Sequence, residues 1–138
     1  MKRFIILILP LYLFTISCKK DKVKSASIDA FRLCEAVSSD KRCEDNVSAF
    51  DATTALIFAS VTVNDAKDDD YLTISWVYTS DYYEIDEVSV RLGDYIQDNT
   101  AQIAGSLSRP TAGWPAGNYE VKASLTGGIS ITRTFSIQ

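Results

Sequence analysis

The chain has 138 residues, about one domain at the usual size of roughly 100–200 residues. It contains no histidine, which removes the commonest general base near neutral pH, the commonest zinc ligand, and any Ser–His–Asp or Cys–His catalytic arrangement. From Glu44 onward there are 14 acidic and 5 basic residues, a net charge of −9, which does not favour nucleic acid as a partner. Partners with basic patches would suit this charge, unless the acidic residues serve only solubility.

The first seventeen residues have the order of a secretory signal peptide. A basic pair at residues 2–3 precedes an apolar run over residues 4–16, which is short for a membrane-spanning helix. The segment "TISC" ends in Cys18 and resembles the lipobox of bacterial lipoproteins, with Thr15 in place of the more common Leu. This relaxed form resembles the lipoboxes of spirochaete and Bacteroidetes lipoproteins. The alternative is an ordinary signal peptide followed by an unrelated cysteine.

The lipoprotein resemblance implies that Cys18 becomes the mature N-terminus and carries acyl chains such as palmitate. Several chains together anchor a protein stably to a membrane. Residues 18–27 then form a polar tether with four lysines, which can also contact anionic head groups. The resemblance predicts an outer-membrane lipoprotein displayed at the cell surface.

The two remaining cysteines, Cys34 and Cys43, form an even pair in an exported chain. They enclose eight residues and have no histidine or Cys-x-x-Cys spacing beside them, so a structural disulfide is predicted rather than a metal or redox site. The spacing of Ile28, Phe31 and Cys34 predicts a turn or two of helix. Residues 28–44 are therefore expected to be a disulfide-stapled segment that precedes the main domain.

From residue 54 onward, apolar and polar residues alternate as they do in half-buried strands. Leu56 and Phe58 indicate burial on both faces where the first strand begins, and a weaker strand is expected around residues 103–109. Residues 126–128 (TGG) predict a hairpin, and Arg133 in an inward position predicts a bulge, an edge position or a strand end. The positions expected to face the core are Ala55, Ile57, Ala59, Val61 and Val63; Leu72, Ile74, Trp76 and Tyr78; Val88, Val90 and Leu92; Tyr119, Val121, Ala123 and Leu125; and Ile129, Ile131, Phe135 and Ile137.

Residues 45–138 resemble a bacterial immunoglobulin-like domain, an antiparallel all-β sandwich of six to seven strands. Trp76 lies where such domains keep their core tryptophan, and Tyr119 follows a Pro-Ala-Gly-Asn turn as the tyrosine corner does. Val121 stands where antibody domains have a cysteine, so the inter-sheet disulfide is missing. The segment "RPTAGWPAGNYEV" also resembles a Trp-Pro-x-Gly-x-Tyr corner that precedes the last hairpin of many exported bacterial proteins. It supports fold and location and carries no catalytic residues.

Two loops are candidate sites. Residues 64–70 contain four aspartates with oxygen ligands suitable for Ca²⁺, but not in EF-hand order, so a solvated turn is favoured and calcium binding stays open. Residues 80–87 place Tyr82, Tyr83 and Glu84 in an end loop, where tyrosines favour protein binding. The alternative there is that one tyrosine caps the core. Trp114 is a secondary binding candidate, although a cover over the sandwich's end explains it better.

No catalytic residues, cofactor, metal site or small-molecule substrate are predicted. A paired-carboxylate glycosidase would need two separated acids around a cleft, and a sandwich of about 95 residues seldom supplies a pocket of about 300 Å³. The sequence therefore predicts a noncatalytic binding module. The spirochaete resemblance implies an adhesin for host extracellular-matrix or plasma proteins, including complement regulators. The alternative is a periplasm-facing accessory lipoprotein of an envelope complex.

Overall fold

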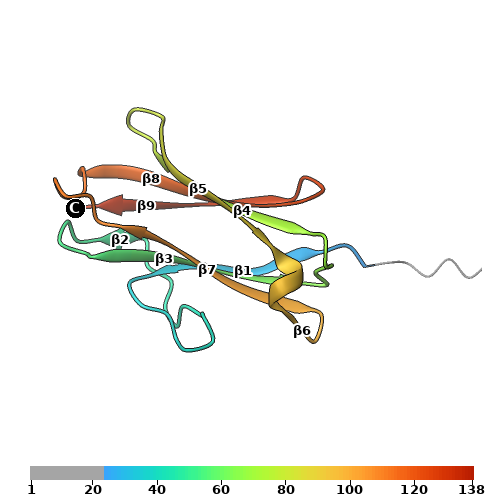
Figure 1. Ribbon diagram of the computed structural model, residues 1–138. Coiled ribbons are helices and arrows are strands. Elements are labelled where there is room, and N and C mark those ends of the chain that lie inside the picture. Colours follow the sequence, from blue (N-terminus) through green and yellow to red (C-terminus); the bar gives the residue numbers. More distant parts are fainter. Residues whose placement is uncertain (1–23) are drawn as a thin grey trace, which may run out of the picture.

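Alternation of apolar and polar residues produces two packed sheets in the computed structural model, which describes residues 24–138 (Figure 1). Seven strands are long, two contain only two residues, and one 3₁₀ turn interrupts them. In chain order the elements are β1 (Ser27–Cys34), β2 (Ala49–Phe50), β3 (Leu56–Asn64), β4 (Tyr71–Tyr78), β5 (Tyr83–Arg91), η1 (Leu92–Tyr95), β6 (Ile96–Gln97), β7 (Thr100–Ser108), β8 (Gly117–Leu125) and β9 (Ser130–Ile137).

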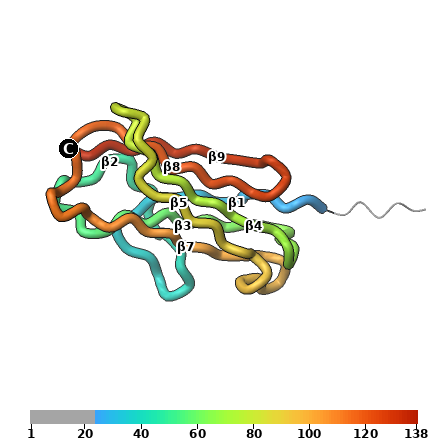
Figure 2. The backbone as a smooth tube through the Cα atoms, turned by 45° about the horizontal axis from the view of Figure 1, so that its top comes forward, coloured from blue at the N-terminus to red at the C-terminus, as the bar shows by residue number. Residues whose placement is uncertain are grey.

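The strand order is that of an immunoglobulin-like sandwich. One sheet has the order β1-β3-β7-β6 and the other β2-β9-β8-β4-β5, and every pairing is antiparallel except the short one between β2 and β9. The first order matches strands A, B, E and D of that fold, and β9-β8-β4 matches G, F and C, with β5 as an added edge strand. Figure 2 shows the two layers from a second direction. The fold class predicted from the sequence is confirmed.

Aromatic side chains fill the middle of the sandwich. Trp76 on β4 is 1% exposed and meets Phe135 edge-on, with ring centroids 6.2 Å apart. Phe135 stacks on Tyr119 at 5.0 Å. The Tyr119 hydroxyl donates to the carbonyl oxygen of Pro115, four residues earlier, which is the contact that defines a tyrosine corner. Both sequence-predicted landmarks of the fold are therefore present.

The predicted helix at the start of the domain is wrong, because residues 27–34 form strand β1. This strand pairs with β3 from Ser27 opposite Asn64 to Cys34 opposite Phe58. A register shift between Ile28 and Ala30 breaks the simple alternation, which explains why the spacing of apolar residues resembled a helix. The sandwich consequently includes residues that the sequence analysis placed in a separate segment before residue 45.

Most inward positions are confirmed, and the exceptions lie at strand ends and edges. Leu56 is 37% exposed at the first position of β3, so burial on both faces was wrong at that residue, although Phe58 on the same face is half-buried. Val88 is 42% exposed because β5 is the last strand of its sheet. Arg133 lies at an edge position, one of the predicted alternatives. It pairs with β8 on one side of β9, and on the other side β2 pairs only with Ser136 and Ile137. Its Nε donates to the Phe31 carbonyl oxygen at 3.3 Å, which links β9 to β1 of the other sheet.

The two ends of the sandwich carry different loops. Ser27 pairs with Asn64 at one end, beside the β8–β9 hairpin and the connections that enter β4 and leave β5. The opposite end holds the β4–β5 hairpin, the 109–116 loop and the C-terminus, and both views show this hairpin projecting beyond the sheets (Figures 1 and 2). The β4–β5 hairpin therefore lies far from the point where the chain enters the domain.

Candidate functional site

The β4–β5 hairpin is a projecting loop on a fixed base. Residues 79–82 connect the two strands, and Tyr82 takes the left-handed conformation with φ 50°, as the closing residue of such a loop requires. The Thr79 amide and hydroxyl both donate to the Asn118 carbonyl oxygen, at 3.0 and 2.9 Å. These two bonds hold the base against β8 and leave the remainder of the loop in solvent.

Tyr82 and Tyr83 are both on the surface, with 88% and 64% of each residue exposed. The alternative in which one of them caps the core is wrong, because Tyr78 fills that position and tilts against Tyr119 with ring centroids 4.9 Å apart. A register shift opposite the step from Trp76 to Val77 adds one residue to β5 next to this tip. Two adjacent tyrosines are thus largely exposed to solvent at this tip.

Acidic side chains surround this pair, and they repel one another. The pKa of Glu84 is raised above its ordinary value, chiefly because its protonated form donates a hydrogen bond to Glu87 and because Glu87 is negatively charged; the charge of Asp86 adds to the effect. All three carboxyl groups are exposed on β5. The hairpin therefore combines two exposed rings with a concentrated negative charge, and a basic partner surface would relieve the repulsion.

Trp114 belongs to the core and is withdrawn from the binding surface. It is only 6% exposed, and its indole Nε1 donates to the Thr54 carbonyl oxygen at 2.6 Å. Its ring meets Tyr119 edge-on at 6.3 Å. A ligand cannot reach the ring without opening this end of the sandwich, so the structure favours the covering role that the sequence analysis preferred.

In the acidic turn at residues 64–70, hydrogen bonds join side chains to the backbone of the turn. The Asp70 carboxylate accepts from the Lys67 amide at 2.9 Å, and the Asp68 carbonyl oxygen accepts from Arg91 Nε at 2.9 Å. Within residues 24–138, no three acidic or cysteine side chains converge as a metal ion requires. The aspartates of this turn therefore form a solvated connection between β3 and β4 in the structure.

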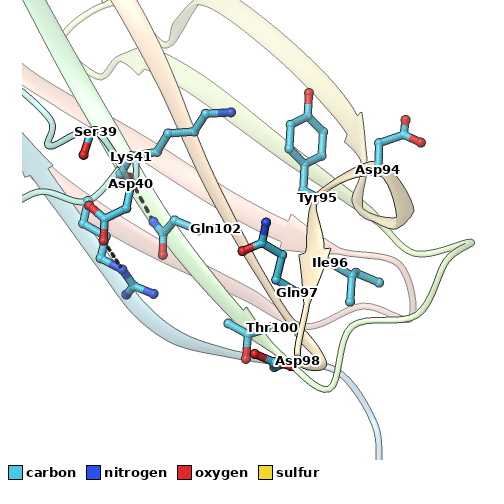
Figure 3. A pocket seen from close by; sticks show the side chains of 11 residues that line it. Ser39, Asp40, Lys41, Asp94, Tyr95, Ile96, Gln97, Asp98, Thr100 and Gln102 are labelled. Carbon is cyan, nitrogen blue, oxygen red and sulfur yellow. Dashed lines mark hydrogen bonds and ion pairs between the residues drawn. The ribbon is translucent and has the colours of Figure 1, made fainter.

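An open groove of about 620 Å³ lies on the outer face of the β1-β3-β7-β6 sheet (Figure 3). From the sequence, a sandwich of this size was expected to supply a pocket of about 300 Å³ only seldom, so this groove was not predicted. One wall is the disulfide loop, defined as residues 34–43, and the other wall is η1 with β6. The lining residues are Ser39, Asp40, Lys41, Arg42, Asp94, Tyr95, Ile96, Gln97, Asp98, Thr100 and Gln102.

The disulfide loop is held down at several points. The Cys34–Cys43 bond closes its base, as predicted. The Lys41 carbonyl oxygen accepts from Ser60 Oγ at 3.1 Å and from Gln102 Nε2 at 3.0 Å. A hydrogen bond from Ser38 is the main cause that lowers the pKa of Asp40 below its ordinary value, with a smaller contribution from the charge of Arg42. The loop thus forms a rigid wall rather than a loose connection.

No protein-family model matches this sequence, and no curated protein matches it significantly. Residues 24–138 include no helix long and apolar enough to span a membrane. Cys18 and the predicted signal peptide lie outside the described residues.

Proposed function

We propose that the chain is a bacterial lipoprotein, anchored in the outer membrane through Cys18 and displayed at the cell surface, whose sandwich is a noncatalytic protein-binding module. The contact surface is the β4–β5 hairpin with Tyr82, Tyr83 and Glu84. The partners expected from the lipoprotein resemblance are host extracellular-matrix or plasma proteins, including complement regulators.

The observation that carries the proposal is the pair of exposed tyrosines, Tyr82 and Tyr83, at the end of the domain opposite Ser27. Tyrosine provides a large contact area at low conformational-entropy cost and is enriched at energetic centres of protein interfaces. Cys18 stands nine residues before Ser27, so a lipid there tethers the domain by its other end. The hairpin then faces outward, toward partners.

The test is a double substitution, Tyr82→Ala with Tyr83→Ala, in the full chain. Capture of immobilised matrix and plasma proteins should weaken at least about tenfold, which corresponds to about 1.4 kcal/mol. Tyr71→Ala is the matched control, because Tyr71 is also exposed, at 48%, but lies at the opposite end of β4. Capture that survives the double substitution unchanged would remove the hairpin from the proposal.

Cell-surface display is tested separately by protease treatment of intact cells. A surface lipoprotein should be degraded, whereas a periplasm-facing accessory subunit should be protected until the outer membrane is opened. Protection in intact cells would favour the accessory role and rule out an adhesin.

A further inference from the structure

The groove beside the disulfide loop has walls that are fixed without a ligand. Lys41 adopts a left-handed backbone conformation with φ 63°, and its carbonyl oxygen is held by two side chains from β3 and β7. The facing wall ends in a tight hairpin turn in which Asp98 and Asn99 have φ of 50° and 64°. Binding sites that are already formed lose less entropy when they take a ligand.

Polar groups of the groove remain available for a ligand. The interactions drawn among the lining residues join only Gln102 to Lys41 and Asp40 to Arg42 (Figure 3). The side chains of Asp94, Gln97 and Asp98 are outside these pairs. Together they offer carboxylate acceptors and an amide that both donates and accepts.

Charges of both signs line the groove, so the lining is uniformly complementary to neither an anion nor a cation. Asp40, Asp94 and Asp98 repel an anion, whereas Lys41 and Arg42 repel a cation. An apolar ligand would cover polar groups without satisfying their hydrogen bonds, which is unfavourable. What fits is a neutral molecule with many hydroxyl groups, because each hydroxyl both donates and accepts.

Tyr95 adds an apolar surface to this polar lining. The residue is 40% exposed, and the Lys41 Nζ lies 4.9 Å from its ring centroid. Contacts of this kind at exposed sites are weak, so a ligand can displace the ammonium group or use it as a donor. A sugar ring has an apolar C–H face that can lie on an aromatic ring and hydroxyl groups around its rim, and this combination matches Tyr95 and its polar neighbours.

We propose that this groove binds a neutral saccharide. Its volume of about 620 Å³ lies within the roughly 300–1,000 Å³ of small-molecule sites. In this arrangement the sugar contacts Tyr95, Gln97 accepts and donates beside it, and Asp98 accepts at the other side. The site is separate from the hairpin and does not depend on its role.

The test is a titration of the full chain with neutral oligosaccharides, in a detergent without a sugar head group, followed by backbone amide NMR shifts. One arm uses N-acetylglucosamine trimer, as a sugar of bacterial envelope type, and the other uses mannose trimer and lactose, as sugars of host glycans. Shifts should concentrate in residues 39–42 and 94–102, with a Kd on the order of millimolar, as expected for an open site with few contacts. The arm that binds identifies the source of the ligand.

Tyr95→Ala should raise the Kd at least about tenfold, whereas Tyr95→Phe, which keeps the ring, should retain most of the affinity. Asp98→Asn keeps a residue suited to the left-handed turn but removes the charge, and we expect a Kd about three- to tenfold higher. Amide shifts of residues remote from the groove report whether each variant is folded, so a loss of binding through unfolding is recognised.

The proposal is overturned if no sugar shifts these amides at about 20 mM, a concentration above any useful Kd, or if Tyr95→Ala binds as well as the native chain. The Tyr82→Ala, Tyr83→Ala protein should bind sugar normally. Failure of the sugar titration therefore leaves the hairpin proposal standing, and failure of protein capture leaves the groove proposal standing.

Discussion

Tyr119 makes three aromatic contacts at the hairpin end of the domain. Its ring stacks on Phe135, tilts against Tyr78 and receives the edge of Trp114. Its hydroxyl donates to the Pro115 carbonyl oxygen in the corner that precedes β8. One side chain thereby joins the central aromatic cluster to the loop that covers this end.

Tyr119→Phe should destabilise the protein by about 1 kcal/mol, because it removes the hydrogen bond and leaves the Pro115 carbonyl oxygen without its partner, while the ring contacts remain. For a domain of this size the melting temperature should fall by about 4 °C. Tyr78→Phe is the control: that hydroxyl also donates to a backbone oxygen, of Ala116, but in an exposed setting where water can replace it. Thermal denaturation followed by circular dichroism measures both.

The same hydroxyl makes stability depend on alkaline pH. Burial raises the pKa of Tyr119 above its ordinary value, and the neighbouring Tyr78 raises it further. The stabilisation is therefore complete below the unfolded pKa of about 10 and is lost as the pH rises through the folded pKa. Urea denaturation at pH 8 and above pH 10 should show the native protein losing its advantage over Tyr119→Phe. A difference that stays constant over this range would contradict the assignment.

At the scale of elements, the disulfide loop affects both the stability of the domain and the groove, because it carries the Cys34–Cys43 bond and forms one wall of the groove. The bond closes a short loop, because Cys34 and Cys43 are nine residues apart in sequence. Cys34→Ala with Cys43→Ala should cost about 2–3 kcal/mol, since a short loop limits the entropy removed from the unfolded chain. Urea denaturation gives this value.

The local effect of the same substitution should be confined to one wall. Amide hydrogen exchange should accelerate in residues 35–42, because the loop would then be held by side-chain hydrogen bonds alone, with Thr54, Ser60, Thr62 and Gln102. The hairpin at residues 79–82 should exchange as before. Unchanged protection of the loop would mean that those polar bonds suffice and that the disulfide is dispensable for the groove.

Strands with strict alternation were predictable, and the strand with a local irregularity was not. In β8 every second residue from Tyr119 to Leu125 is buried, as the pattern predicts. In β1 the register shift after Ile28 changes the spacing of apolar residues, so the sequence matched a helix better than a strand. The pairing with β3, which decides the outcome, is a tertiary contact that no local pattern records.

The two surface sites differ in the same way. The hairpin tip is one continuous stretch, so its place at an end of the sandwich was predictable. The predicted loop over residues 80–87 was too long, because Tyr83 and Glu84 already belong to β5, and the sequence left open whether Tyr82 or Tyr83 was buried. The groove is assembled from residues 39–42, 94–98 and 100–102, each of which is an unremarkable polar segment alone. Only the folding of the disulfide loop back over β3 and β7 brings them together.

At the scale of the whole molecule, charge is poorly compensated. Residues 24–138 contain 17 acidic and 9 basic residues. The ion pair between Arg42 and Asp40 is the single one found in this part of the chain, and both side chains are largely exposed. Most acidic groups therefore face solvent among other acidic groups, and in β5 the hydrogen bond to Glu87, together with the charges of Glu87 and Asp86, raises the pKa of Glu84. Such self-repulsion opposes the compact state.

Stability should consequently rise when sodium chloride is increased from about 10 mM to about 500 mM, because the screening length falls from about 30 Å to a few ångströms. Two like charges about 10 Å apart repel by about 0.4 kcal/mol in water, so relief of several pairs should total about 1 kcal/mol. Glu87→Gln removes one charge from the β5 cluster, and it should raise the melting temperature at low salt and flatten the salt dependence. Lys122→Gln removes a positive charge and should do the opposite. A protein that loses stability as chloride is added would show that attractive pairs outweigh the repulsion among its acidic residues.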